Sequence, residues 1–279
     1  MSVKYPESGT TNCSGCDQHD TSAAAAFVFR VLGLISGPEA PGTLSWWTFS
    51  DVFQEHNIPR VVREQGLPQT VFSSTYGLQT ISGVRKPGGG DTKVESVYSS
   101  ENWLPGENES SPFHAFATMD SSAPGLSSTM VFVSLWGNPH SHGAPHHTTT
   151  PQQVTANRTA TINIVHDAAT GRFESTPPST IWATRIDEQH ANPQAAWKAM
   201  GSPAKPSAAQ LQALHVASEL HPQELPLETR CHKAPGPNPP NPPGLCVTVT
   251  LELAPNTAVL LSFKKPTIGS GSVADGSRK

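Results

Sequence analysis

The chain has 279 residues and a formal net charge of −4; 14% of its residues are charged, and it contains 27 prolines and 22 glycines. A chain of this length forms one large domain or two ordinary ones, and we expect two. The many turn-forming residues predict few long helices. The acidic balance without a basic stripe argues against nucleic acid or a membrane as partner. Because the longest apolar stretch, residues 23–35, is broken by Arg30 and is too short to span a bilayer, we expect a soluble protein.

Residues 20–36 (DTSAAAAFVFRVLGLIS) predict the first long helix. Asp20 or Thr21 can accept hydrogen bonds from the free N–H groups at its start. The Gly-Pro pair at residues 37–38 ends it. Apolar side chains recur every three or four residues and predict one buried face: Ala25, Val28, Phe29 and Leu32.

Strands are expected on both sides of this helix. Residues 2–5 predict a short strand with Glu7 just beyond it, and residues 43–49 (TLSWWTF) predict an aromatic strand. Acidic and amide side chains follow the second strand: Asp51, Gln54 and Glu55. The order strand, carboxylate, helix, strand, carboxylate is typical of parallel α/β units. In (β/α) barrels the chemistry lies at the carboxyl ends of the strands.

The stretch SWWTFSDVFQEHNIP, residues 45–59, combines aromatic rings with acids. At a barrel rim the rings would stack on a flat ligand, and the acids would hold its hydroxyl groups. The alternative is that Trp46 and Trp47 are core residues and that Glu55 is solvated, because most aromatic strands serve packing.

A change of pattern divides the chain. Residues 88–111 lose periodicity and predict a linker, and residues 266–279 predict a disordered tail. Between them, short alternating segments predict an antiparallel β-sandwich. Its expected strands are 113–120, 128–137, 159–167, 180–187, 246–254 and 257–265. An amphipathic insert at residues 206–220 predicts a helix with Ser207 as N-cap.

Cysteine and histidine clusters give only weak indications of a metal. Cys13 and Cys16 have the spacing of a zinc or redox pair, but no second pair accompanies them. The histidines of residues 140–147 (HSHGAPHH) lie among Gly, Pro and Thr, which favours a solvated loop. We therefore expect no metal. Cys231 and Cys246 flank a proline-rich loop whose ends a disulfide could join.

Three Asn-x-Ser/Thr sequons begin at Asn12, Asn108 and Asn157. Sequons are used only in a secretory compartment. Residues 1–11 lack the basic and apolar regions of a signal peptide, so the protein is intracellular or its real start is missing. The sequence leaves the compartment open, with a mild preference for secretion.

Three stretches together resemble glycoside hydrolase family 39, the family of β-xylosidases and α-L-iduronidases. Residues 45–55 (SWWTFSDVFQE) resemble its eighth barrel strand, and residues 185–203 (RIDEQHANPQAAWKAMGSP) resemble its signature in the C-terminal sandwich. Residues 7–28 resemble the region that follows the catalytic nucleophile. The resemblance implies α/β plus all-β architecture: the C-terminal fragment of a (β/α)8 TIM barrel in residues 1–87, followed by a β-sandwich in residues 112–265.

The resemblance also implies a function. Members are retaining glycosidases that act on glycosides or oligosaccharides without a cofactor, using two carboxyl groups. Glu7 matches the nucleophile, Trp47 the ring that walls the sugar subsite, and Glu55 one of the paired acids that hold sugar hydroxyls. Gln54 stands where the family has the other acid. The alternative for Glu7 is an exposed acid in a frayed terminal loop.

Other positions depart from the family. Pro6 precedes Glu7, where the family has Thr or a similar residue, and no Asn-Glu-Pro, the motif of the acid/base, occurs in the 279 residues. We expect a truncated chain that begins near the seventh strand and is inactive alone. The alternative is a non-catalytic carbohydrate-binding module with Trp47 and Trp103 as stacking residues.

Overall fold

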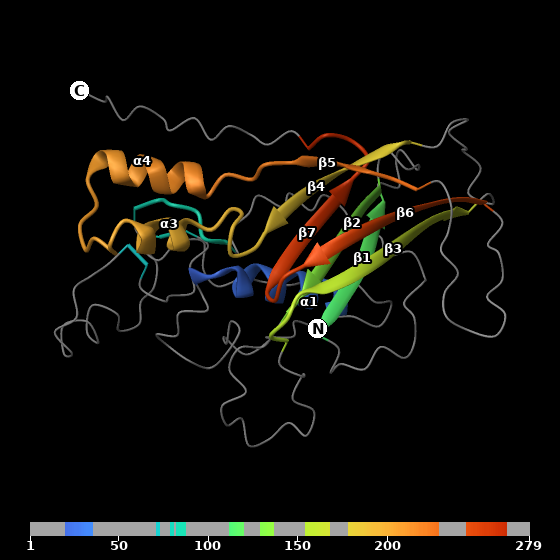
Figure 1. The fold of residues 1–279 in the computed structure, drawn as a ribbon, viewed down its shortest axis with the longest axis horizontal. Helices are drawn as coiled ribbons and strands as arrows, with labels where there is room; N and C mark the ends of the chain where they lie inside the picture. Colours follow the sequence, from blue (N-terminus) through green and yellow to red (C-terminus); the bar gives the residue numbers. More distant parts are fainter. Residues whose placement is uncertain are drawn as a thin grey trace, which may run out of the picture.

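A computed structural model describes nine segments of the chain, which are mostly sheet with few helices (Figure 1). These are residues 20–35, 71–72, 79–80, 82–87, 112–119, 129–136, 154–167, 178–228 and 244–266. The expected strands at 2–5 and 43–49 and the expected linker at 88–111 lie outside these segments, as do residues 267–279 of the expected tail. No helix in the described segments is long and apolar enough to cross a membrane.

The described elements include every helix and strand that the sequence predicts between residue 113 and residue 265, and the first long helix. In chain order they are α1 (Ser22–Ile35), β1 (Phe113–Met119), β2 (Thr129–Leu135), β3 (Arg158–Asp167), β4 (Thr180–Ile186), α3 (Pro193–Ala199), α4 (Ala208–Ala217), β5 (Gln223–Pro226), β6 (Gly244–Leu253) and β7 (Thr257–Ser262). The short elements α3 and β5 were not predicted from the sequence.

All strand pairs in this part of the chain are antiparallel, as predicted, and they form two sheets. The larger sheet has five strands in the order β1-β2-β7-β4-β5, and the smaller is the β3-β6 ribbon. β7 therefore lies between β2 and β4, which puts the last of the described strands in the middle of the sheet (Figure 1).

The five-stranded sheet is covered on both faces. Successive side chains of a strand point to opposite faces, so a strand covered on one face alternates buried and exposed residues. In β2, by contrast, six of the seven residues are buried. Val131 and Val133 pack toward the β3-β6 ribbon, while Phe132 between them packs toward α1.

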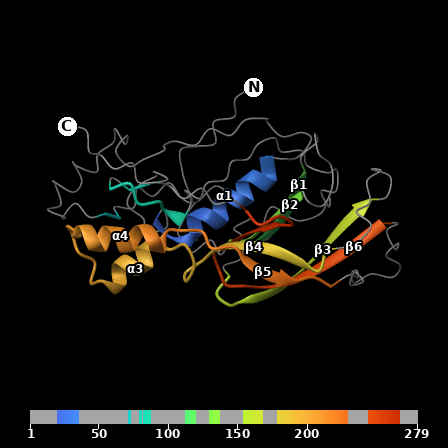
Figure 2. The same cartoon turned by 90° about the horizontal axis from the view of Figure 1, so that it is seen from above.

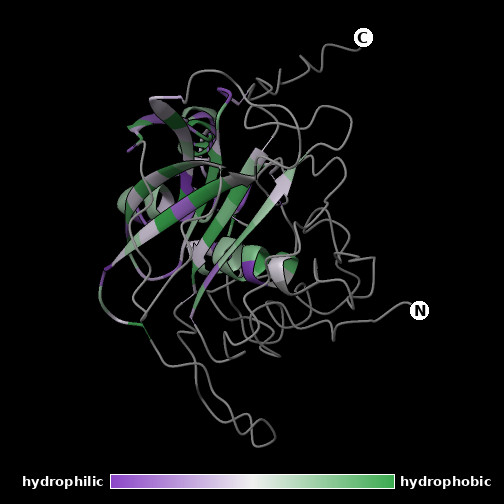
Figure 3. Ribbon diagram, turned by 90° about the vertical axis from the view of Figure 1, so that its right-hand side faces the viewer, coloured by the Kyte–Doolittle hydropathy of each residue, from purple (hydrophilic) through white to green (hydrophobic). Residues whose placement is uncertain are grey.

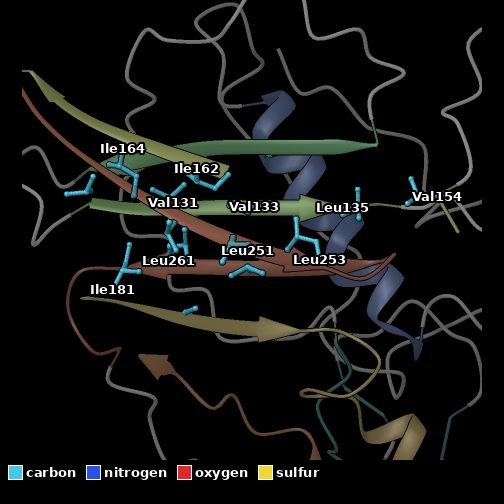
Figure 4. Close-up of a cluster of buried hydrophobic side chains, with 14 residues drawn as sticks. Val131, Val133, Leu135, Val154, Ile162, Ile164, Ile181, Leu251, Leu253 and Leu261 are labelled. Carbon is cyan, nitrogen blue, oxygen red and sulfur yellow. The ribbon is translucent and has the colours of Figure 1, made fainter. Parts of the chain in front are cut away.

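One face of the sheet and the ribbon enclose a cluster that we call the ribbon-side core (Figure 4). All of its buried members are aliphatic: Val131, Val133, Leu135, Val154, Ile162, Ile164, Ile181, Ala183, Val247, Val249, Leu251, Leu253, Val259 and Leu261. The β-branched residues among them favour extended backbone, which is why these segments form strands. Figure 3 shows the hydrophobic residues along the same strands.

The opposite face of the sheet is covered by α1, which lies across it in Figure 2. Thr21 caps the helix, because its Oγ1 accepts a hydrogen bond from the N–H of Ala23 at 3.3 Å. We call the cluster between the helix and the sheet the helix-side core. Its buried members are Ala25, Phe29, Phe132, Ile186, Ala191 and Ala258. The predicted helix and one of its two predicted caps are confirmed. Of the four residues predicted to form one buried face, Ala25 and Phe29 are buried, and Val28 and Leu32 are half-buried. The first turns are also buried on their other sides, through Ala23, Ala24 and Ala26.

Candidate functional site

The four residues that the sequence assigns to the site are Glu7, Trp47, Gln54 and Glu55, and all four lie outside the described segments. The Cys13-Cys16 pair and the histidines of residues 140–147 lie outside them as well. The structure does describe the elements that border the matched stretches: the start of α1, the turn at residues 79–87 and the signature at residues 185–203. In these segments no group of three or more His, Cys, Asp or Glu side chains could hold a metal ion.

A buried ion pair joins the start of α1 to the turn at residues 79–87. Lys86 Nζ lies 2.7 Å from Asp20 Oδ1, and the two side chains are 1% and 0% exposed. Two charges that have both left water are held in place by each other, because separating them would cost each one its opposite charge in the interior. The pair therefore fixes residue 20, which lies within the matched stretch of residues 7–28, against residue 86.

The turn that carries Lys86 is built from its own hydrogen bonds. Thr80 N–H donates to the Val84 carbonyl at 2.9 Å, and Val84 N–H donates to Thr80 Oγ1 at 3.2 Å. Gly83 has a φ of +75°, a conformation that glycine adopts without the strain a side chain would bring. The backbone of Gln79 bridges that of Arg85, so the turn is a small closed loop. Lys86 leaves this loop at a fixed position.

A second buried cation lies on the same side of the sheet. The guanidinium carbon of Arg30 is 5.1 Å from the ring centroid of Trp136, and Arg30 is 6% exposed. Phe27 contacts the same tryptophan with ring centroids 5.5 Å apart. A cation over an indole face is attracted by the ring quadrupole, more strongly when both groups are desolvated. The arginine that interrupts the apolar stretch thus attaches α1 to the end of β2.

The signature at residues 185–203 begins with a tight turn around Asp187. Oδ1 of Asp187 accepts hydrogen bonds from the N–H groups of Gln189 at 2.8 Å and His190 at 2.9 Å, and lies 2.8 Å from His190 Nδ1. The carboxylate is buried, and Arg185 also lies beside it, with Nη1 3.7 Å from Oδ2. Ala191 follows with a φ of 51°, the left-handed conformation that ends the turn.

The second half of the signature forms α3. Asn192 is its N-cap, with Oδ1 accepting from Ala195 N–H at 3.2 Å, and Pro193 occupies the first turn. Trp197 Nε1 donates to the Pro203 carbonyl at 3.0 Å, which folds the chain back after the helix. The Asp, His, Asn, Pro and Trp of this motif therefore all serve to shape one turn and one helix.

That helix contacts the segment that follows the predicted eighth strand. The rings of Phe72 and Trp197 lie 5.5 Å apart, and Val71 and Val84 pack with them. Leu214 completes the cluster from α4, which starts with the predicted Ser207 cap: Ser207 and Gln210 exchange two hydrogen bonds in a capping box. The signature thus connects α3 and α4 to Val71, Phe72 and Val84.

The described segments therefore contain none of the four residues that the sequence assigns to the site, but they do describe the contacts of the segments beside them. Sequence reasoning missed the Asp20–Lys86 pair and considered Asp20 only as a cap of the first long helix. Neither residue lies inside an apolar segment, so the sequence around each one gives no sign that its charge is buried. The partner of such a charge is not visible in the sequence.

Comparisons with known proteins give a consistent relationship. The model of Glycosyl hydrolases family 39 matches residues 3–231. Over 226 residues the chain is 26% identical to a β-xylosidase of Caldicellulosiruptor saccharolyticus. The matched region covers 81% of this chain and 39% of that protein. Over 69 residues it is 33% identical to a β-xylosidase of Geobacillus stearothermophilus, covering 25% of this chain and 12% of the relative.

The fold has a counterpart among solved structures. The crystal structure of a monomeric β-xylosidase from Caulobacter crescentus CB15 superposes with a TM-score of 0.51 at 18% identity, covering 91% of this chain and 43% of that one. At this identity the likeness concerns the fold alone. The chain spans about two fifths of the length of the Caldicellulosiruptor and Caulobacter proteins.

Proposed function

Because the chain belongs to glycosyl hydrolase family 39, we propose that it is part of a retaining O-glycoside hydrolase of the β-xylosidase type. The observation that carries this proposal is the family match over residues 3–231, since it includes both the stretch that begins at Glu7 and the signature at residues 185–203. The similarity to two β-xylosidases supports the substrate class, a glycoside or an oligosaccharide.

The proposed chemistry uses carboxyl groups alone. In retaining glycosidases two carboxyl groups lie about 5 Å apart, and one attacks the anomeric carbon while the other protonates the leaving oxygen. We assign the attack to Glu7. Trp47 would wall the sugar subsite, and Glu55 and Gln54 would hold sugar hydroxyls, Gln54 as an uncharged donor and acceptor.

The described residues support this assignment by what they hold in place. The matched stretch of residues 7–28 contains Asp20, whose carboxylate is paired with Lys86 in the interior. The loop after the predicted eighth strand ends at the same lysine. A fixed ion pair between these two segments would keep the acid of one near the rim of the other, as positioning of reacting groups requires.

The domain organisation belongs to the same proposal. Residues 1–87 would form the last part of a (β/α)8 barrel, residues 88–111 a linker, and residues 112–265 a β-sandwich followed by a tail. The helix-side core and the contacts of α3 and α4 with residues 71–84 would then join the two domains. In this arrangement the signature at residues 185–203 docks the sandwich against the barrel.

We further propose that the 279 residues turn over poorly by themselves. They contain no Asn-Glu-Pro, the motif that carries the family's proton donor. Without general acid assistance the leaving group departs more slowly, by a factor of about 10² to 10⁴. The acid/base would belong to a longer product of the same gene.

Sequencing the transcript upstream of Met1 tests the assignment, and we expect an in-frame Asn-Glu-Pro. The longer product should release the alcohol steadily from an aryl β-xyloside, and Glu7→Gln should abolish this release. Glu39→Gln is the matched control, because it removes a carboxylate from outside the matched acid positions. Inactivity of the longer product on aryl xylosides would refute the proposed function.

The 279-residue chain itself gives a separate measurement. We expect no steady release from the same substrate, and release that Glu7→Gln abolishes would disprove the proposed inactivity of the isolated chain. Calorimetric titration with xylo-oligosaccharides distinguishes the remaining alternative. Saturable binding without turnover in both the short and the long product would identify a carbohydrate-binding module instead.

A further inference from the structure

The β3-β6 ribbon begins at a sequon. Asn157, Arg158 and Thr159 form an Asn-x-Thr sequence, and Asn12 and Asn108, which begin the other two sequons, lie outside the described segments. Asn157 directly precedes β3, and all five residues from 155 to 159 are exposed. A glycan on an Asn side chain needs this exposure, because the sugar must remain in water after the chain has folded.

We propose that Asn157 is an N-glycosylation site and that the protein matures in an oxidising, secretory compartment. This goes beyond the proposed glycosidase activity, which does not depend on the compartment. Two independent observations carry the proposal: the surroundings of Asn157 on the folded ribbon, and the oxidation state of a cysteine on the same ribbon.

The surroundings of Asn157 suit a bulky, hydrated substituent. The outward face of β3 exposes Thr159, Thr161 and Asn163 near the sequon and Val165 further along. The neighbouring strand exposes Glu252 and Thr250 opposite the two threonines. A glycan lying over this face would cover polar groups that hydrogen-bond with sugars and water. The apolar residues Ile162 and Ile164 point the other way, into the ribbon-side core (Figure 4).

The position also protects an edge of the sheet. Among the described strands β3 pairs only with β6, and it is ten residues long. A long unpaired edge is a template for addition of a foreign strand, and proteins block such edges with charge, proline or bulk. A glycan at the first residue before β3 would supply that bulk at one end of the edge.

The second observation is the disulfide of Cys246. This cysteine lies on β6 opposite Val165 of β3 and is disulfide-bonded, with a partner outside the described segments. Disulfides persist in oxidising compartments and are rare in the cytosol. N-glycans are added in the same compartments, so the bonded cysteine and the exposed sequon indicate one cellular environment. Cys231, across the proline-rich loop, stays the predicted partner.

The modification is a group transfer from a lipid-linked oligosaccharide diphosphate. The side-chain nitrogen of Asn157 forms a bond to the anomeric carbon of the first sugar, and the bond from that carbon to the phosphate oxygen breaks. The lipid diphosphate leaves with the electron pair, and the amide proton passes to a base of the transferase. The hydroxyl of Thr159 is the part of the sequon that the transferase recognises.

The experiment is site-resolved mass spectrometry of the full 279-residue chain, expressed in a eukaryotic cell behind a cleavable leader. Both the secreted and the membrane-enclosed pools are examined, because glycans are added before export. We expect a glycopeptide at Asn157, and treatment with peptide N-glycosidase should convert this residue to Asp. An unmodified Asn157 in both pools would overturn the proposal, including the case in which Asn12 or Asn108 is glycosylated.

Matched variants separate the sequon from the fold around it. Asn157→Gln and Thr159→Val should remove the glycan, and Thr159→Ser should retain it. Thr159 Oγ1 also donates to Glu252 Oε1 at 2.6 Å, so Glu252→Ala tests loss of that hydrogen bond with the sequon intact and should keep the glycan. Asn163→Gln alters an asparagine of the same strand outside any sequon and should also keep it. A glycan that persists in Thr159→Val would contradict the assignment.

Discussion

The two faces of the five-stranded sheet are packed by different chemistry. The buried part of the ribbon-side core is aliphatic throughout. The helix-side core contains Phe29 edge-on to Phe132 with centroids 5.2 Å apart, and Phe116 stacked on the same ring at 4.7 Å. Beside it lie the buried cations Arg30 and Lys86, the first over an indole ring and the second paired with a carboxylate.

The difference follows from where the residues of each core come from. The ribbon-side core is made entirely of residues 113–263, so one continuous region of the chain supplies both of its layers. The helix-side core combines α1 with strands that begin some eighty residues later. Aliphatic packing is enough for elements that belong together, whereas directional contacts such as ring stacks and ion pairs fix how two distant segments meet.

The largest effect is expected from the ion pair on the helix side. Lys86→Met leaves the Asp20 carboxylate, which is 0% exposed, without the ammonium 2.7 Å away. Removing one partner of a buried pair lowers the free energy of unfolding by about 3–5 kcal/mol. Urea unfolding of the full chain, followed by tryptophan fluorescence, measures this loss.

A second variant shows whether the charge is the cause. Asp20→Asn combined with Lys86→Met removes both charges of the pair and should recover a large part of the stability. Lys198→Met is the control, because Lys198 is exposed on α3. If Lys86→Met and Lys198→Met had the same midpoint of urea unfolding, the ion pair would add no measurable stability, and packing alone would stabilise the helix side of the sheet.

Local pattern predicted the elements well. The period of the apolar residues gave α1 and six strands, and Thr21 and Ser207 were recognised as caps because a cap is defined by its own neighbours in sequence. Apolar periodicity and helix caps each depend on residues only a few positions apart. They can therefore be recognised in the sequence without knowledge of the fold.

The features that the sequence did not predict, such as β5 and the contact between Trp197 and Phe72, depend on residues that are distant in the sequence. The strand β5 has four residues, and it forms because β4 offers an edge from Thr180 to Ala183. The signature was recognised by resemblance, but its role as the turn that brings Trp197 onto Phe72 required coordinates. The candidate catalytic residues Glu7, Trp47, Gln54 and Glu55 stay predictions, because they lie outside the described segments.

The next largest effect compares neighbouring leucines of β7 on opposite faces. Leu261 is fully buried in the ribbon-side core, and Leu260 is only partly buried on the helix side. Leu261→Ala should lower the free energy of unfolding by about 2–5 kcal/mol, because it removes contacts and leaves a cavity. Leu260→Ala changes the same atoms on the same strand and should cost less. Equal losses in urea unfolding would show that the two faces are packed equally tightly.

The smallest effect concerns how closely α1 approaches the sheet. A Cβ atom on Gly33 would lie 3.0 Å from Cδ1 of Phe116, which is held by its stack on Phe132. Gly33→Ala gains about 0.5–1 kcal/mol from reduced backbone freedom in a helix. Overpacking of this kind costs about 1–3 kcal/mol, so we expect a net loss of roughly 1 kcal/mol in thermal or urea unfolding.

A double-mutant cycle isolates the steric part of this effect. With Phe116→Ala the ring is absent, and Gly33→Ala should then stabilise the protein by the propensity gain alone, about 0.5–1 kcal/mol. The change of sign between the two backgrounds is the expected result. If Gly33→Ala has the same effect with and without the ring, the helix does not rest against Phe116.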